Sequence, residues 1–211
     1  MPKALPRRAL LALTVMFAVA VPAIQPALAD SKVAEGYVSD NIHKGLEILN
    51  NKTLPRAQKE QQFEVFLLNL TDMKRIAMFT LGQYRRGASQ GDLDAFAAAF
   101  QNYATAVYQS YFAKYSGQTL KVTSSTERSP TDFVVQTQLI DPNAGSQPPL
   151  EVAFRVRTDA GKPVVVDVSV SGIWLSLEER DQFVAFLGQN GGNIHTLIGH
   201  LSDLAKQYRT G

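Results

Sequence analysis

The sequence predicts an α+β fold, with helices packed on one face of a twisted antiparallel sheet of about four strands. Three observations predict it. Helical periodicity of apolar residues runs from about residue 32 to 115, strand alternation from about 118 to 171, and helical periodicity again from 176 to 208. Helices segregated from consecutive strands in this way are typical of α+β proteins.

The first 29 residues have the layout of a secretory signal peptide. Three basic residues precede an apolar run over residues 9–21, and Ala27-Leu28-Ala29 is typical of a cleavage site. The apolar run is too short to span a bilayer comfortably. We therefore expect residues 1–29 to be removed, and residues 30–211 to form a single domain that is long enough to bury a sizeable core.

Removal of this leader would reverse the sign of the net charge. The whole chain has 21 Lys and Arg against 19 Asp and Glu, a formal net charge of +2. Three of the basic residues and none of the acidic ones are in the leader, which leaves 18 against 19 and a net charge of −1. Nucleic acid is therefore not an expected partner. The chain has no Cys, so an exported form would depend on its apolar core rather than on disulfides.

Two helices are expected in the first half of the chain. Thr53 is a favourable N-cap residue, and Pro55 would then lie in the first helical turn. The apolar stripe of this helix consists of Phe63, Phe66, Leu67 and Leu70. The next helix is expected to begin at Thr71 or Asp72, and its apolar residues are Met73, Ile76, Phe79 and Leu81.

The strongest helical signal follows a glycine-bordered loop over residues 87–91. Ser89 and Asp92 there resemble a capping box, in which a hydroxyl and an acidic side chain satisfy the first backbone N–H groups. Apolar residues then recur at spacings of three and four, at Leu93, Phe96, Ala97, Phe100, Tyr103, Ala104, Val107, Tyr108, Tyr111 and Tyr115. Ser176 and Glu179 resemble a second capping box, and the last helical stripe runs from Ile194 to Tyr208.

Strands are expected over residues 132–140, 150–157 and 164–171. A tight-turn sequence at residues 158–161 separates the last two strands. Val164, Val166, Val168 and Val170 alternate with polar residues that include Asp167 and Ser169. We therefore expect one face of the sheet to meet solvent and the other to be covered by the helices.

One motif resembles an enzyme site. Residues 87–91 match GxSxG, and the acid and histidine that a hydrolase would need follow as Asp132 or Asp167 and then His195 or His200. The context does not fit, because a helical segment precedes the motif where a hydrolase has a buried strand. We expect Ser89 to be a helix cap and the protein not to be an enzyme, with a secreted serine hydrolase of lipid esters as the alternative.

No metal or cofactor is expected. His195 and His200 are five residues apart, so they do not share a helix face as a zinc-binding pair four apart would. Gly188, Gly191 and Gly192 follow a helix rather than a strand, which favours a helix C-terminus over a nucleotide-binding loop.

Three segments, in their order and spacing, resemble one family. Leu81-Gly82-Gln83-Tyr84 leads into the long helix, which is followed by Tyr115-Ser116-Gly117-Gln118-Thr119. Ile140-Asp141-Pro142-Asn143 precedes Pro148-Pro149 and an alternating strand. Val166-Asp167-Val168 leads to Ser171-Gly172-Ile173-Trp174-Leu175. The chain is similar to the MlaC, or toluene-tolerance, family of periplasmic phospholipid-binding proteins over nearly all of residues 30–211.

The resemblance implies a soluble periplasmic lipid carrier with a pocket between sheet and helices. Its implied partners are an outer-membrane lipoprotein complex and an inner-membrane ABC transporter with a lipid-binding ring. The implied ligand is a phospholipid, with a hopanoid as an alternative because some relatives accompany hopanoid synthesis. A different possibility for the whole protein is a periplasmic scaffold with a packed core and no ligand. The tail-facing residues implied are Phe79, Phe100, Tyr103, Val107, Tyr111, Val135, Val152, Phe154, Val168, Val170 and Trp174.

Overall fold

The structure, a computed structural model, describes residues 27–112, 114–159 and 161–210. Most of the predicted signal peptide, residues 1–26, lies outside these described residues. Within them, no helix is both long enough and apolar enough to cross a membrane.

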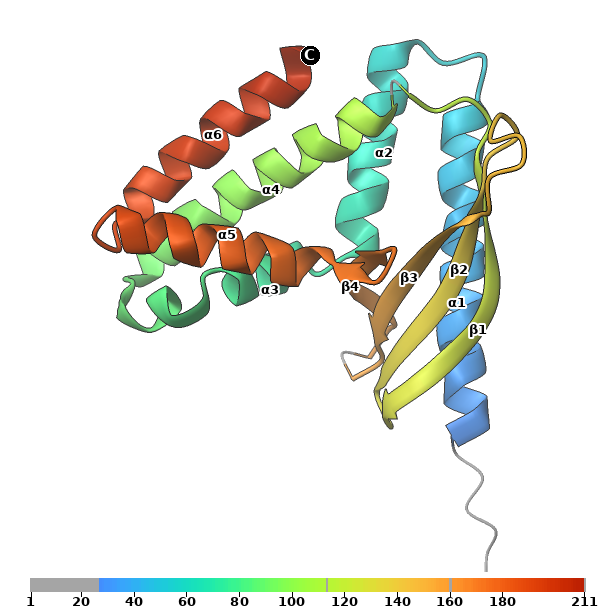
Figure 1. The fold of residues 1–211 in the computed structure, drawn as a ribbon, viewed down its shortest axis with the longest axis horizontal. Helices are drawn as coiled ribbons and strands as arrows, with labels where there is room; N and C mark the ends of the chain where they lie inside the picture. Colours follow the sequence, from blue (N-terminus) through green and yellow to red (C-terminus); the bar gives the residue numbers. More distant parts are fainter. Residues whose placement is uncertain (1–26, 113, 160, 211) are drawn as a thin grey trace, which may run out of the picture.

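Helices form both ends of the described chain, and a sheet lies between them in sequence (Figure 1). The helices are α1 (Ala27–Asn50), α2 (Arg56–Leu70), α3 (Met73–Thr80), the 3-10 helix η1 (Gly82–Gly87), α4 (Gln90–Phe112), α5 (Leu175–Gln189) and α6 (Ile194–Thr210). The strands are β1 (Thr119–Ser129), β2 (Asp132–Ile140), β3 (Leu150–Arg157), β4 (Val164–Val170) and β5 (Ile173–Trp174). The predicted α+β class is confirmed.

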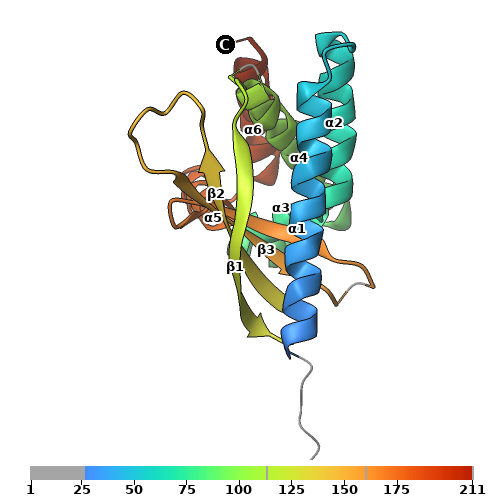
Figure 2. The same ribbon diagram turned by 90° about the vertical axis from the view of Figure 1, so that its right-hand side faces the viewer.

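The strands pair in sequence order, each antiparallel to the next, and form one sheet. The fifth strand, which the sequence did not predict, has two residues and closes a tight hairpin with β4. Ser171 and Gly172 both have positive φ in that hairpin, as a two-residue turn between antiparallel strands requires. Helix α1 runs along one face of the sheet, and α2 lies beside α1 (Figure 2).

The described residues form two apolar cores. In the first, α3, α4, α5 and α6 pack around Phe96, Phe100 and Phe183, whose rings meet edge to face or tilted at centroid distances of 6.2 Å. In the second, Ala34 and Val38 of α1 pack against buried residues of the sheet. Sheet and helical bundle are thus separate packing units, and the space between them is bounded by elements from both.

Two of the four predicted helix starts are confirmed, and the other two, at Thr53 and at Ser176, are wrong. The Asp72 carboxylate accepts a 3.0 Å hydrogen bond from the backbone N–H of Arg75 at the start of α3. At the start of α4, the Ser89 hydroxyl accepts a 3.2 Å bond from the Asp92 N–H and donates to the Asp92 carboxylate at 2.8 Å. Thr53 does not cap α2, because its hydroxyl donates to the side chain of Asn51 and the helix begins after Pro55.

The predicted faces of β4 are wrong in part. Arg155 and Val156 of β3 pair with Asp167 and Val165, so Val166 is an extra residue that bulges out of the ladder. Because a one-residue shift exchanges the two faces of a strand, Val165 and Val168 lie on the same face. The polar face does not meet solvent at this strand, since Asp167 and Ser169 are 7% and 4% exposed and the start of α5 covers them.

The second predicted capping box is also wrong. Ser176 lies within α5, which begins at Leu175, and no side chain of the helix caps its N-terminus. Ser176 instead donates its hydroxyl and its N–H to the carboxylate of Asp167 in β4, at 2.6 and 3.1 Å. Glu179 turns away from the helix end and accepts a hydrogen bond from Tyr103 of α4.

Candidate functional site

An apolar cavity of about 320 Å³ lies between α1, α2 and the sheet. None of the described side chains that line it is charged. Its apolar walls come from α1 (Val38, Ile42, Leu46, Leu49), α2 (Phe63, Phe66, Leu67, Leu70) and the sheet (Leu120, Leu139, Phe154, Val165, Val168). A space with such walls suits hydrocarbon, because a polar group placed there would lose its hydrogen bonds to water without replacement.

Contacts between the walls hold this cavity in shape. Helices α1 and α2 pack closely at Gly45, where a Cβ would lie in van der Waals contact with the Phe66 ring, at 3.4 Å. The Tyr37 hydroxyl donates to the carbonyl of Leu70, and the Tyr115 hydroxyl donates to the side chain of Asn50, both at 3.1 Å. The two hydrogen bonds join α1 to the end of α2 and to the segment that leads into β1.

A second chamber of about 290 Å³ adjoins the apolar cavity. The two share Thr71, Tyr108, Val165 and Val168 as walls. The bridge between Thr71 and Val165 holds the link between α2 and α3 against β4 at this boundary. The second chamber opens between α4, α5 and α6, where Tyr111 and Tyr208 are 62% and 41% exposed. The two chambers are therefore neighbours that share part of their lining.

The second chamber differs from the first in that two carboxylates, those of Asp167 and Glu179, line it. Glu179 accepts a 2.9 Å hydrogen bond from the Tyr103 hydroxyl through Oε1. Burial raises the pKa of Glu179, and burial together with the Glu179 charge raises the pKa of Tyr103. The pKa of Tyr108 is raised to about 12, first by burial and then by the charges of Asp167 and Glu179. The carboxyl group of Glu179 is thus poorly solvated, and no Lys, Arg or His is among the described side chains that line the chamber with it.

The predicted tail-facing residues fall into four groups. Phe154 and Val168 line the apolar cavity. Four residues of α4 line the second chamber, which Val168 also borders: Phe100, Tyr103, Val107 and Tyr111. Val135 and Val152 are buried in the sheet, and Val170 pairs with Val152 on the same face.

The last group, Phe79 and Trp174, lines neither chamber. Trp174 pairs with Ser169, on the face of the sheet opposite to Val168. Phe79 is 39% exposed and contributes to a different pocket.

Sequence reasoning missed the residues of α1 that line the apolar cavity. Val38, Ile42, Leu46 and Leu49 follow one another at spacings of three and four, which is the signal that could have identified them. The apolar stripe of α2 was recognised as helical but not as a cavity wall. Both omissions have one cause, because an apolar stripe that faces a cavity has the same sequence pattern as one that faces a packed core.

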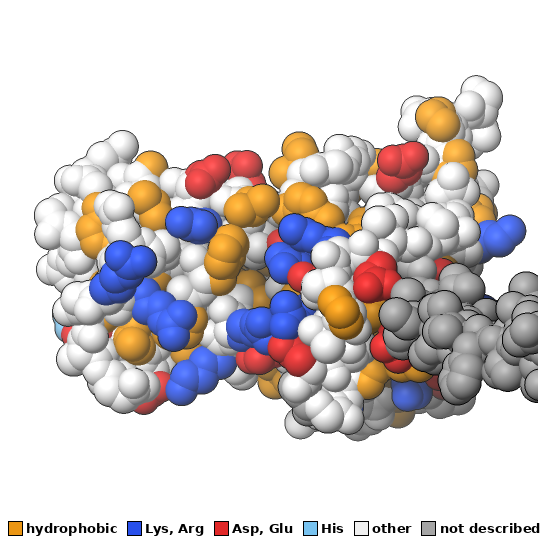
Figure 3. All heavy atoms as spheres, turned by 90° about the horizontal axis from the view of Figure 1, so that it is seen from below, with side chains coloured by type: hydrophobic (Ala, Val, Ile, Leu, Met, Phe, Trp, Pro, Cys, Tyr) orange, Lys and Arg blue, Asp and Glu red, His pale blue; other side chains and the backbone are white. Residues whose placement is uncertain are grey.

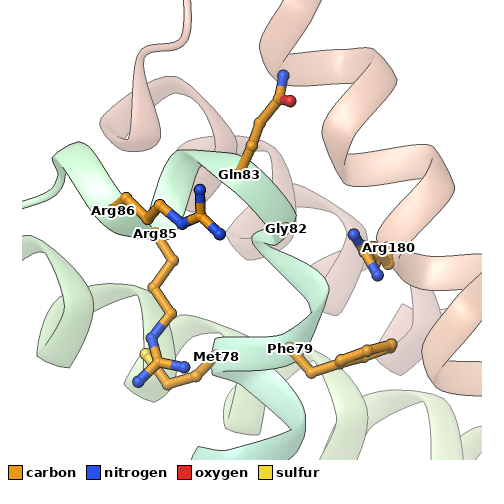
Figure 4. A pocket seen from close by; sticks show the side chains of 7 residues that line it. All are labelled: Met78, Phe79, Gly82, Gln83, Arg85, Arg86 and Arg180. Atoms are coloured by element: carbon orange, nitrogen blue, oxygen red, sulfur yellow. The ribbon is translucent and has the colours of Figure 1, made fainter.

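A third pocket, lined by basic side chains, lies on another part of the surface. It has a volume of about 450 Å³ and is lined by Arg85 and Arg86 of η1, Arg180 of α5 and apolar side chains that include Phe79 (Figure 4). The Arg180 guanidinium lies 5.1 Å from the centre of the Phe79 ring. The face seen from below carries several basic side chains interspersed with apolar ones (Figure 3). This pocket shares no lining residue with either chamber, and its guanidinium groups suit an anionic group rather than an acyl chain.

The residues of the alternative hydrolase are not arranged as a triad. Ser89 and His195 both contact Asp92, with Ser89 Oγ at 2.8 Å and His195 Nε2 at 3.0 Å from its carboxylate oxygens. The serine thus donates to a carboxylate and not to the imidazole that would have to remove its proton. Asp132 and Asp167 have other partners, Arg155 and Ser176. The Phe186 ring stacks on His200 at 4.6 Å. Within the described residues no group of three or more acidic, His or Cys side chains could hold a metal ion.

Comparison with known proteins gives two findings. Residues 39–203 match the family model described as MlaC protein. The fold is similar to that of a phospholipid-binding protein from Ralstonia solanacearum, solved in complex with a phospholipid, with a TM-score of 0.72 and 22% sequence identity. The match covers 83% of this chain and 98% of that one.

Proposed function

Because the chain belongs to the MlaC protein family, we propose that it is a periplasmic carrier that binds a phospholipid by its acyl chains and releases it unaltered. The observation that carries this proposal is the apolar cavity between α1, α2 and the sheet, whose described lining side chains bear no charge. The similar protein from Ralstonia solanacearum, which binds a phospholipid, supports the choice of ligand.

The energetics of acyl chains require that cargo be exchanged at a surface. Burial of an acyl chain is worth about 0.8 kcal/mol per CH₂, so two chains of roughly 15 carbons represent about 24 kcal/mol. Release into water would cost that amount, whereas transfer to another apolar site costs little. We therefore propose that exchange takes place on docked partners, an outer-membrane lipoprotein complex and an inner-membrane ABC transporter with a lipid-binding ring.

Lipid extraction tests this proposal. Protein exported to the periplasm of a Gram-negative host should release a phospholipid into organic solvent, identified by mass spectrometry. A hopanoid from a hopanoid-producing host would support the alternative cargo. Protein that is free of lipid, and that takes none up from phospholipid vesicles, would contradict the proposal and support a scaffold with no ligand.

A pair of variants on α1 tests whether the cavity holds the lipid. Ile42 lines the apolar cavity, whereas Val33 on the same helix is 51% exposed and lines neither chamber. We expect Ile42→Glu to lose most of its bound lipid while circular dichroism shows a folded protein, because a carboxylate there would have no partner. Val33→Glu makes the same chemical change on the surface and should retain full lipid content. Equal lipid content in the two variants would place the lipid elsewhere.

A further inference from the structure

The second chamber has an acceptor that nothing in the described structure satisfies. Oε1 of Glu179 accepts the Tyr103 hydroxyl, whereas Oε2 is buried and has no hydrogen-bond partner among the described residues. Both oxygens of the other carboxylate in the chamber, Asp167, accept hydrogen bonds, from the hydroxyl and N–H of Ser176 and from the N–H of Val168. A buried carboxylate oxygen without a donor is costly, so a donor supplied by a ligand would be stabilising.

No Lys, Arg or His is among the side chains that line this chamber. Its remaining walls are rich in aromatic rings, namely Phe100, Tyr103, Tyr108, Tyr111 and Tyr208. The rings of Tyr103 and Tyr208 meet edge to face at a centroid distance of 6.1 Å, beside the Glu179 carboxylate. Aromatic faces attract cations, and together with a carboxylate they form the usual surroundings of a bound ammonium group.

We propose that the second chamber binds the primary ammonium group of a phospholipid of the ethanolamine type, with Glu179 as its counter-ion, while the acyl chains occupy the adjoining apolar cavity. This inference rests on the proposed function, and it adds a selectivity for the head group. A primary ammonium donates the hydrogen bond that Oε2 of Glu179 lacks. A quaternary choline ammonium has the charge but no N–H to donate, and a glycerol head group leaves the lipid with a negative charge that faces two carboxylates.

Competition between head groups tests the inference. Delipidated protein is incubated with vesicles of phosphatidylethanolamine and phosphatidylglycerol in equal amounts and with identical acyl chains, and the lipids bound to the re-isolated protein are measured by mass spectrometry. Because a hydrogen bond to a charged group is among the stronger ones, we expect phosphatidylethanolamine to be enriched by about tenfold or more, which corresponds to about 1.4 kcal/mol. In vesicles of phosphatidylethanolamine and phosphatidylcholine, the ethanolamine lipid should again be the enriched one.

Two variants on one turn of α5 test whether Glu179 is responsible for the selectivity between head groups. Glu179→Gln keeps the shape of the side chain and an acceptor for Tyr103 but removes the charge, so the composition of the bound lipid should approach that of the vesicles. Glu178→Gln removes the same charge from an exposed neighbour and should keep the enrichment. Circular dichroism checks that both are folded.

Bound lipid that mirrors the vesicle composition in the native protein would overturn this inference and leave the lipid carrier intact. Enrichment that persists in Glu179→Gln would also overturn it. Failure to take up any lipid would instead contradict the proposed function itself.

Discussion

The carboxylate of Asp167 in β4 accepts two hydrogen bonds from Ser176 in α5, one from the hydroxyl at 2.6 Å and one from the backbone N–H at 3.1 Å. A strand residue nine positions earlier in the chain thus caps a helix that has no cap of its own. Because both residues line the second chamber, this contact also fixes where α5, and with it Glu179, stands relative to the sheet.

Replacement of Asp167 should therefore destabilise the protein strongly. Asp167→Ala leaves three buried or half-buried donors without an acceptor, and we expect a loss of about 3 kcal/mol in the free energy of unfolding. Ser176→Ala removes one of these bonds and should cost about 1 kcal/mol. Urea denaturation measures both, and equal losses in the two variants would show that the shared contact is not what stabilises this junction.

A methyl group at Gly82 should be poorly tolerated. Gly82 has a φ of +54°, and a Cβ there would stand 2.8 Å from the Cγ2 of Val184 in α5. We expect Gly82→Ala to destabilise the protein by about 2 kcal/mol in thermal or urea unfolding. Gly87 ends the same 3-10 helix with open space around it, so Gly87→Ala should change stability by less than about 0.5 kcal/mol. A neutral Gly82→Ala would mean that η1 shifts away from α5 without cost.

Loss of the Ser89 hydroxyl should affect stability and not chemistry. Because the hydroxyl caps α4, Ser89→Ala should lower the free energy of unfolding by about 1 kcal/mol, and Ser89→Thr should restore most of it. Lipid content should be the same in all three proteins. An ester-hydrolysing activity in the native protein that disappears in Ser89→Ala would instead favour the hydrolase.

The stability of the lipid-free protein should depend on pH through Glu179. Burial raises its pKa above the ordinary value of 4.5, so the folded state holds the proton more tightly than the unfolded state does. Its stabilising contribution is therefore fully present below pH about 4.5 and is lost as the pH rises through the folded-state pKa. Glu179→Gln cannot titrate, so its stability relative to the native protein should increase from pH 4 to pH 7. If the difference in stability between Glu179→Gln and the native protein is constant from pH 4 to pH 7, Glu179 does not cause the pH dependence of stability.

Much of the secondary structure could be predicted from local patterns. The strand over residues 132–140 was predicted with the observed bounds, and the caps at Asp72 and Ser89 were identified correctly. These features depend on residues that are at most three or four positions apart, so the local sequence alone is sufficient to predict them. The order of three short motifs was also sufficient to indicate the family.

What tertiary structure decided was the direction in which individual side chains point. A bulge at Val166 exchanged the faces of β4. Ser176 and Glu179 have the spacing of a capping box, but the carboxylate that caps α5 belongs to Asp167. The sequence predicts that Glu179 caps the start of a helix, but in the structure it lines a chamber to which α4, α5, α6 and β4 contribute. Each outcome depends on elements far apart in the chain, because a local pattern indicates that a face is apolar or polar but not which distant element will cover it. The distinction between an apolar stripe that lines a cavity and one that fills a core therefore arises only when the helices and the sheet are assembled.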